Sequence, residues 1–268
     1  AELTRRAGRL KLGPAVEAAA RVRPLSASPA FSVTANFVGR RNYSTDEIKA
    51  AVAEGIRARC GWKYAAEDES EINLRLFIEH DQAFVGLRLA RAPLHRRPYK
   101  QDNLPGSLKP TAAAAMLAAA GLLPGGSVLD PFCGAGTILV EAALAGAEAC
   151  GGDAAPDALA AAQANAARAG ERIALGRWDA RRLPLASRSV PLVVTNLPWG
   201  RQVQVGDEIE TFYRQACAEI ERVLTGNGQV VALTNLPHLL EFSRRKKTAH
   251  IEISLFGQTP AIVRYAVE

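Results

Sequence analysis

The stretch Val193–Gly200 (VVTNLPWG) combines residue types that could hold a flat, polar group where a predicted strand ends. Pro198 has no N–H to donate to a strand ladder, so the strand must stop there. The Asn196 side-chain oxygen and the Leu197 carbonyl could each accept one N–H from an exocyclic amine of a base. Trp199 offers an aromatic face for stacking, a contact worth about 1–3 kcal/mol per base. The spacing therefore predicts an acceptor pair beside a stacking surface.

Such an acceptor pair suits the methylation of an amine. An exocyclic amine is a poor nucleophile because its lone pair is delocalised into the ring. Two fixed acceptors would favour the pyramidal amine that attacks a methyl group, an electrostatic effect of oriented dipoles. Direct in-line transfer needs neither a metal nor a covalent enzyme intermediate. No metal site is expected, since the four histidines show no ligand spacing: His80, His95, His238 and His250.

A second candidate segment, Asp130–Thr137 (DPFCGAGT), follows another predicted strand and opens a helix. Gly134 and Gly136 would let the backbone approach a ligand closely, and the helix N-terminus could hold a carboxylate. Neither of the usual phosphate-binding patterns, GxGxxG and GxxxxGK[ST], is present. Equally, the two glycines could serve only a tight turn. Cys133 has no neighbouring base, which favours a packing role.

Two acidic residues follow further predicted strands. Asp153 lies roughly 20 residues beyond the glycine segment, where an acid can hold both hydroxyls of a ribose; it could equally be the N-cap of the helix that starts at Pro156. Asp179 could accept from the exocyclic amine of an adenine, or could be a solvated loop acid. A nucleoside site without a phosphate-binding motif indicates S-adenosylmethionine rather than ATP or NAD.

These segments need a framework that brings strand ends together. From Lys109 onward predicted strands and helices alternate, which indicates a doubly wound parallel sheet of the α/β class. Seven strands are expected, and a helix is predicted over residues 237–245. The last two strands are separated by a short link, so they should form an antiparallel hairpin at the sheet edge.

The first third of the chain has a different order of predicted strands and helices. Residues 31–91 predict strand–helix–strand–strand, a small α+β module, with Ser44 and Glu47 as a capping box. Residues 1–30 are rich in Ala, Arg and Pro, and within them VRPLSASPA (Val22–Ala30) predicts a linker, since Pro and Ser repeatedly break local order. Residues 92–108 are punctuated by Pro and predict a connector between two domains.

Composition narrows the class of protein. A chain of 268 residues allows two domains, and no apolar run is long enough to span a bilayer. Four scattered cysteines favour free thiols in a reducing cytoplasm. The net charge of +6 permits a polyanionic partner. The chain starts at Ala1 rather than Met, which suggests a fragment of a longer protein.

The segments VLDPFCGAGTILVEAAL and TNLPWGRQV resemble the motifs of Rossmann-like RNA methyltransferases that carry a THUMP domain. Residues 31–91 resemble the THUMP fold, and PGSLKPTAAAAML resembles the segment that precedes the first sheet strand in that family. The resemblance implies a Rossmann-like methyltransferase domain at residues 109–268, with residues 1–30 as a linker or a remnant of a ferredoxin-like domain. It implies methylation of the guanosine N2 amine in RNA, with tRNA favoured. A monomer is expected.

The resemblance also assigns residues. The catalytic set is Asn196, Leu197, Pro198 and Trp199. Many amino-methyltransferases have Pro where this chain has Leu197, but only a backbone carbonyl is required there, and the difference points to the tRNA branch. The expected cofactor-binding residues are Asp130, Pro131, Cys133, Gly134, Gly136, Thr137, Asp153, Ala154, Asp179, Ala180 and Asn196. The expected RNA-binding residues are Arg40, Arg41, Arg96, Arg97, Tyr99, Lys100 and Arg201.

Other functions remain open at this point. The same chemistry could serve a guanine of 23S rRNA, and related enzymes methylate amino groups of DNA or of protein glutamine. A non-catalytic RNA-binding relic is a different class, against which the complete NLPW and DPFCGAGT segments weigh. The THUMP-like module disfavours DNA and protein substrates. The connector cations could instead belong to a solvated linker, and Arg40 and Arg41 could simply protect an edge strand.

Overall fold

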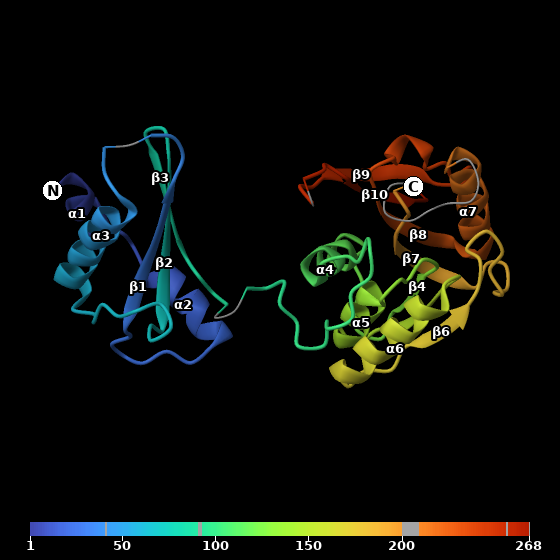
Figure 1. The fold of residues 1–268 in the computed structure, drawn as a ribbon, viewed down its shortest axis with the longest axis horizontal. Coiled ribbons are helices and arrows are strands. Elements are labelled where there is room, and N and C mark those ends of the chain that lie inside the picture. The colour runs from blue at the N-terminus through green and yellow to red at the C-terminus, as the bar shows by residue number, and fades with distance from the viewer. Residues whose placement is uncertain (41, 91–92, 200–208, 256, 268) are drawn as a thin grey trace. The chain divides into compact units, whose positions relative to one another are not determined.

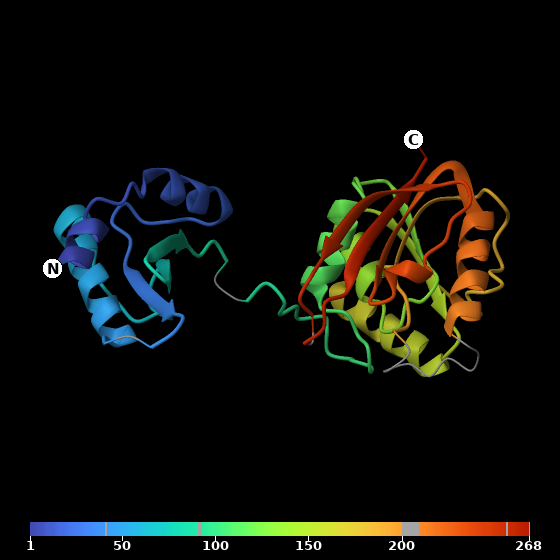
Figure 2. The same cartoon turned by 90° about the horizontal axis from the view of Figure 1, so that it is seen from above.

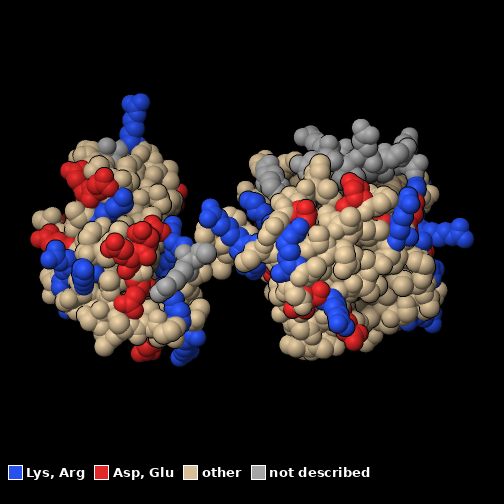
Figure 3. Space-filling model, turned by 60° about the horizontal axis from the view of Figure 1, so that its bottom comes forward, with Lys and Arg blue, Asp and Glu red and all other residues tan. Residues whose placement is uncertain are grey.

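The computed structural model describes residues 1–40, 42–90, 93–199, 209–255 and 257–267. The chain divides into two compact units, Ala1–Pro93 and Leu94–Glu268 (Figure 1). None of the helices in the described part of the chain is long and apolar enough to cross a membrane. On the face drawn in Figure 3, cationic and acidic side chains are interspersed on both units.

The first unit is a three-stranded sheet with helices. Its elements are α1 (Glu2–Ala7), α2 (Gly13–Val22), β1 (Phe31–Phe37), α3 (Thr45–Cys60), β2 (Ile72–Glu79) and β3 (Gln82–Leu87). The order is β1-β2-β3, with β1 parallel to β2 and β2 antiparallel to β3. The predicted capping box is present, since Ser44 Oγ accepts from the Glu47 N–H and Glu47 accepts from the Ser44 N–H. The strand–helix–strand–strand prediction is confirmed.

Residues 1–30 are not a linker throughout, because they form α1 and α2, and of the predicted linker Val22–Ala30 only residues 23–30 lie outside both helices. Ala7 of α1 is buried in the same core as Phe31 and Ile56. Gly55 of α3 makes the crossing with α1 possible, since a Cβ there would collide with the Thr4 carbonyl. Burial of one face against α3 stabilises so short a helix, which would be marginal alone.

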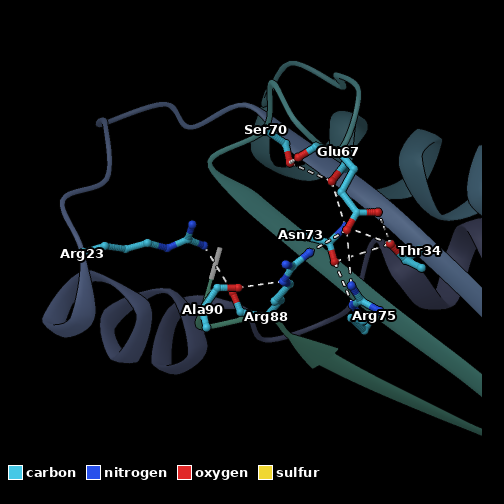
Figure 4. A network of polar contacts seen from close by, with 9 residues as sticks. Arg23, Thr34, Glu67, Ser70, Asn73, Arg75, Arg88 and Ala90 are labelled. Atoms are coloured by element: carbon cyan, nitrogen blue, oxygen red, sulfur yellow. Dashed lines mark hydrogen bonds and ion pairs between the residues drawn. The ribbon is translucent and has the colours of Figure 1, made fainter. Parts of the chain in front are cut away.

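The sheet face opposite this core carries a polar network (Figure 4). Asn73 is 5% exposed and its Nδ2 donates to Thr34 Oγ1 at 3.0 Å. Arg75 Nε donates to Asn73 Oδ1 at 3.1 Å. Glu67 forms ion pairs with both Arg75 (3.3 Å) and Arg88 (2.6 Å). These two cations are therefore bound to an acid of their own unit.

The second unit is a seven-stranded sheet in the order β6-β5-β4-β7-β8-β10-β9. The strands are β4 (Ser127–Asp130), β5 (Glu148–Asp153), β6 (Ala174–Arg177), β7 (Val190–Asn196), β8 (Leu224–Thr234), β9 (Lys246–Glu252) and β10 (Ala261–Ala266). Strands β4 to β8 pair in parallel, and β10 pairs antiparallel with both β8 and β9. The Rossmann-like sheet with an antiparallel final hairpin is thus confirmed.

Helices cover both faces of this sheet (Figures 1 and 2). They are α4 (Pro110–Ala119), α5 (Thr137–Leu144), α6 (Pro156–Ala169) and α7 (Ile209–Val223). Alternate residues of β7 separate the two cores: Val194 packs with α4 and α5, and Val193 packs with α7. Both valines are fully buried, as expected for a central parallel strand.

The helix predicted over residues 237–245 is wrong. Only a single 3₁₀ turn, Pro237–Leu239, forms there. Beyond it, Glu221 of α7 accepts the N–H groups of Ser243 and Arg244 at 2.9 and 2.8 Å. The buried Arg245 guanidinium donates to the Gly228 carbonyl at 2.8 Å. These tertiary hydrogen bonds hold the segment in an irregular path in place of a second helical turn.

Candidate active site

The predicted segments meet at one cavity of about 470 Å³ in the second unit. It lies at the carboxyl ends of β4, β5 and β7, where strand order reverses between β4 and β7 and ligands bind in sheets of this kind. Its wall comes from residues 104–108, 130–135, 153–155, 178–181 and 196–199, with Thr137, Ile138, Ala158, Phe212 and Leu255. Every predicted catalytic and cofactor-binding residue except Gly136 lines it.

The two glycines of the loop after β4 do different things. Gly134 has a φ of 49°, and its N–H donates to Asp153 Oδ2 at 3.0 Å, so the loop is tied to the end of β5. Gly136 is the N-cap of α5 with a φ of 74°. A Cβ on Gly136 would lie 2.8 Å from Ala162 Cβ of α6. The structure therefore gives Gly136 a packing role between two helices, away from the cavity wall.

Asp153 connects two walls of the cavity. Besides the Gly134 bond, its Oδ1 accepts from the Ala155 N–H at 3.0 Å. The alternative role as N-cap is wrong, because Ala155 is the N-cap of α6. Each carboxylate oxygen accepts one backbone N–H and keeps a lone pair, so the group can still accept from ligand hydroxyls.

Asp179 forms a bidentate pair with Arg181 in the loop after β6. Arg181 Nε and Nη2 lie 3.0 and 2.7 Å from Asp179 Oδ2. This hydrogen bonding lowers the pKa of the Asp179 carboxyl, which keeps it ionised as an acceptor. The guanidinium also lies 5.6 Å from the Phe212 ring centroid. The Asp179 side chain is 45% exposed and also lines the cavity, so it is solvated and remains accessible to a ligand.

Trp178 lines the cavity and was not among the predicted residues. Its ring packs across β5 and β6, where Cβ atoms on Gly152 or Gly176 would come within 2.4–2.6 Å of it. Its Nε1 is buried, and no hydrogen-bond partner is found for it in the described part of the chain. The glycines of CGGD and LGRW are the sequence signal that could have identified it.

Asp130 is 1% exposed at the end of β4. Its Oδ1 accepts from Thr195 Oγ1 at 2.6 Å and from the Phe132 N–H at 3.1 Å. Burial raises the pKa of this carboxyl to about 7. Burial also raises the pKa of the Cys133 thiol, so Cys133 lines the cavity as a protonated group and is unsuited to nucleophilic attack.

Asn196 presents an unused acceptor. Its Nδ2 donates to the Gly106 carbonyl at 3.5 Å, which orients the amide. Its Oδ1 is buried, and no partner for it is found among the described residues. An unpaired buried carbonyl oxygen costs about 1–3 kcal/mol unless a ligand donates to it. The Trp199 Nε1 is also buried, and no hydrogen-bond partner for it is found among the described residues. The segment therefore has one unpaired acceptor, at Asn196, and one unpaired donor, at Trp199.

Asn165 of α6 fixes two walls of the cavity and was not predicted. It is fully buried, and its Nδ2 donates to the carbonyls of Ala135 (2.9 Å) and Asp102 (3.0 Å). Its Oδ1 accepts from the Asp102 N–H at 3.2 Å. One side chain thus links the glycine loop to the segment that leads into residues 104–108. An asparagine within a predicted helix gives no sequence signal for this role.

The connector residues do not form the expected RNA-binding surface. Tyr99 is 3% exposed and donates to Glu141 of α5 at 2.8 Å, and Arg97 donates to the same carboxylate at 2.9 Å. The Lys100 Nζ is also buried. The RNA-binding prediction for Tyr99 is wrong, and the Arg97–Glu141 ion pair holds the connector on the second unit. The boundary between the units lies at Pro93 and Leu94.

The remaining predicted RNA contacts have different outcomes. Arg40 and Arg96 are exposed, which leaves them available to a polyanion. Arg41 and Arg201 lie outside the described residues.

Comparison with known proteins identifies the family of the second unit. The family model for the RMKL-like methyltransferase domain matches residues 97–257, more than half of the chain. The U6 snRNA (guanine-N(2))-methyltransferase THUMPD2 of Mus musculus is 32% identical over 216 residues, which are 78% of this chain and 39% of that protein. The tRNA (guanine(6)-N2)-methyltransferase of Thermus thermophilus is 31% identical over 221 residues, 81% of this chain and 65% of that protein.

Solved structures agree on the fold. The crystal structure of TrmN from Thermus thermophilus superposes with a TM-score of 0.69 at 27% identity, over 97% of this chain and 80% of that chain. A possible methylase from Clostridium difficile 630 gives a TM-score of 0.69 at 19% identity, over 100% of this chain and 80% of that chain, and supports the fold alone.

Proposed function

The chain belongs to the family of RMKL-like methyltransferase domains, and from this premise we propose that it transfers a methyl group from S-adenosylmethionine to the exocyclic N2 amine of a guanosine in RNA. The observation that carries the proposal is Asn196, which lines the cavity and whose buried Oδ1 has no hydrogen-bond partner among the described residues. A donor amine is the partner that this oxygen lacks.

The cavity residues fit S-adenosylmethionine. A volume of about 470 Å³ is within the usual range for a small-ligand site. Asp153 would accept from the ribose hydroxyls, Asp179 from the adenine amine, and the glycine loop around Gly134 would lie against the methionine part. Asp130 would face the cationic amine of that part. When bound, the cofactor supplies an electrophilic methyl group.

The chain's own residues would prepare the amine. Asn196 Oδ1 and the Leu197 carbonyl would each accept one N–H of the guanine amine, which orients its lone pair toward the methyl group. Trp199 would stack on the base and keep water out. Because these acceptors are fixed before the base arrives, little reorganisation is needed at the moment of transfer.

Binding of the cofactor should depend on pH through Asp130. Its pKa is raised to about 7 by burial, so the carboxylate that pairs with the ligand amine is fully formed only above that pH. We expect the affinity for S-adenosylhomocysteine, measured by calorimetry, to fall by up to about tenfold per pH unit below 7. Without ligand the sign reverses: the folding stability from this group is present at low pH and is lost as the pH rises from about 4, the usual pKa of an aspartate, to about 7.

Asp130→Asn is the control for this pH dependence. The variant cannot ionise at this position, so its affinity should be weaker and nearly constant from about pH 5.5 to 8.5. A wild-type affinity that stays flat over the same range would contradict the role of Asp130.

RNA is the proposed partner, and residues 1–93 are the proposed THUMP-like RNA-binding unit. The first unit contains a groove lined by Glu54, Arg57, Ala58, Gly61, Trp62, Lys63 and Tyr64. Tyr64 is 40% exposed and packs edge-on against the buried Phe31 ring, with 5.4 Å between the ring centroids. Aromatic faces beside cations suit an unpaired nucleotide, with bases stacked and phosphates neutralised.

Removal of the groove cations should weaken RNA binding in a salt-dependent manner. For the double variant Arg57→Ala/Lys63→Ala we expect the slope of log affinity against log salt to decrease by up to about 1.5, since each single-strand phosphate contact contributes about 0.7. Arg5→Ala/Arg6→Ala is the matched control, because it removes two cations already paired with Glu2 on α1. Equal slopes for the two variants in filter-binding titrations would place the RNA elsewhere.

The relatives suggest two RNA substrates. tRNA is the main candidate, supported by the Thermus thermophilus relative, which shares the larger part of its length with this chain. U6 snRNA is the second, supported by the mouse relative. Incubation of the full chain with labelled cofactor and each RNA separately would decide between them. Labelling of neither RNA would refute the proposal for both.

A further inference from the structure

Two fully buried hydroxyl groups outside the cavity wall hold the Asn196–Trp199 segment. Tyr213 lies on α7 and Thr234 ends β8, and both are 0% exposed. Tyr213 Oη lies 3.0 Å from the Pro198 carbonyl oxygen and 2.7 Å from Thr234 Oγ1. Neither side chain is among those that line the cavity, so neither is placed to touch the base or the cofactor.

The direction of each hydrogen bond follows from the chemistry of the groups. The Pro198 carbonyl can only accept, so the Tyr213 hydroxyl must donate to it. Tyr213 Oη is then the acceptor for the Thr234 hydroxyl. Thr234 Oγ1 in turn accepts from the Leu236 N–H at 2.9 Å. Burial raises the pKa of the Tyr213 phenol, so it stays protonated and can donate at all ordinary pH values.

These bonds fix the peptide that carries the Leu197 carbonyl. On one side, the Leu197 N–H donates to the Leu233 carbonyl at 3.1 Å. On the other, the Pro198 carbonyl is held by Tyr213. Between them the peptide bond is planar and the proline ring restricts φ. The Leu197 carbonyl therefore has little freedom to turn, and no hydrogen bond to it is found among the described residues.

Thr234, which supports Tyr213, belongs to a second copy of the tetrapeptide TNLP, whose first copy contains Asn196. The sequence TNLP occurs at Thr195–Pro198 and again at Thr234–Pro237. In the first copy the threonine hydroxyl donates to Asp130. In the second copy the threonine hydroxyl supports Tyr213. The second copy does not line the cavity, so it contributes through the position of the first.

We propose that Tyr213, supported by Thr234, is a positioning residue that fixes the Leu197 carbonyl as an acceptor for the target amine. The inference rests on the proposed function, because that function gives the carbonyl its role. Loss of the Tyr213 hydroxyl should leave the cofactor site intact and allow the Leu197–Pro198 peptide to move. A displacement of about 1 Å at a reacting group can cost roughly 100-fold in rate.

The test compares two tyrosine variants of the full chain. Tyr213→Phe removes the bond to Pro198 and keeps the ring. Tyr265→Phe is the matched control, because Tyr265 is also buried and donates to a backbone carbonyl, that of Leu240, at 3.0 Å. For Tyr213→Phe we expect single-turnover methyl transfer to slow by roughly 10- to 100-fold, with the affinity for S-adenosylhomocysteine unchanged. Thr234→Val should give a smaller loss in the same direction, and Tyr265→Phe should leave the rate near wild type.

Hydrogen exchange gives a readout that does not depend on activity. The amides of Leu197 and Trp199 should exchange faster in Tyr213→Phe than in Tyr265→Phe or wild type. Equal exchange in all three, or equal rates in both variants where the wild type is active, would overturn the positioning role. A wild type that labels no RNA would refute the proposed function instead, and the exchange rates would still decide whether Tyr213 holds the segment.

Discussion

Asn196→Ala should slow methyl transfer by about 10²–10³-fold while the affinity for S-adenosylhomocysteine stays near wild type. Its Oδ1 is buried and has no partner among the residues that the structure describes, and the proposed amine is the donor it would meet. Loss of one fixed hydrogen-bonding group in a preorganised site typically costs 10²–10³ in kcat. The loss belongs to the transition state, because the acceptor favours the pyramidal amine and not the resting base. Single-turnover kinetics with saturating RNA and cofactor would measure it.

The second TNLP copy provides the control. Asn235 occupies the corresponding position after β8, and its Oδ1 is also buried without a partner in the described part of the chain. It does not line the cavity. Asn235→Ala should therefore keep the rate close to wild type. If both asparagine variants lost activity equally, a general loss of order at the strand ends would explain the effect, and the assignment of Asn196 would fail.

Asp153→Ala should weaken binding of S-adenosylhomocysteine by about 1.5–3 kcal/mol, which is roughly 10- to 150-fold. The variant removes the proposed acceptor for the ribose hydroxyls. It also leaves the N–H groups of Gly134 and Ala155 without their carboxylate partner, so the glycine loop loses its tie to β5. Isothermal calorimetry would give the change directly.

Asp157→Ala separates ligand contact from a helix-dipole effect. Asp157 is an exposed acid in the first turn of the same helix, α6, and does not line the cavity. Its removal takes away one negative charge at the helix N-terminus, whose interaction with the helix dipole is worth about 0.3–1 kcal/mol. The affinity should change little. If Asp153→Ala bound the ligand no more weakly than Asp157→Ala, the ribose role of Asp153 would be excluded.

The framework of the site followed from local patterns in the sequence. Strand and helix alternation from Lys109 onward predicted the parallel sheet, and the carboxyl ends of its strands brought Asp130, Asp153, Asp179 and Asn196 to one cavity. These predictions rest on periodicity and on the geometry of parallel sheets, both of which are local or general. The final hairpin followed from the short link between its strands.

The errors arose where tertiary contacts decide the structure. Residues 237–245 have a helical pattern. The Arg244 N–H, however, donates to Glu221 and the Arg245 side chain donates to the Gly228 carbonyl, and these bonds hold the backbone in a non-helical path. Tyr99 looked like a stacking residue, and its partner Glu141 lies more than 40 positions away. Asn165 and Tyr213 donate hydrogen bonds to backbone carbonyls. Every residue has such a carbonyl, so the sequence does not show which one a side chain will reach. The two TNLP copies are alike in sequence, and only the position of β7 beside β4 distinguishes the one at the cavity.

The proposed function depends on transfer to one atom, the N2 of a guanosine in RNA. The direct measurement is mass spectrometry of nucleosides from tRNA and U6 snRNA transcripts after incubation with the full chain and S-adenosylmethionine. It should be paired with transcripts in which inosine, which lacks the N2 amine, replaces guanosine. We predict N2-methylguanosine as the product from a guanosine transcript and none from its inosine counterpart. A methyl group found on any other atom, or equal incorporation into both kinds of transcript, would contradict this account.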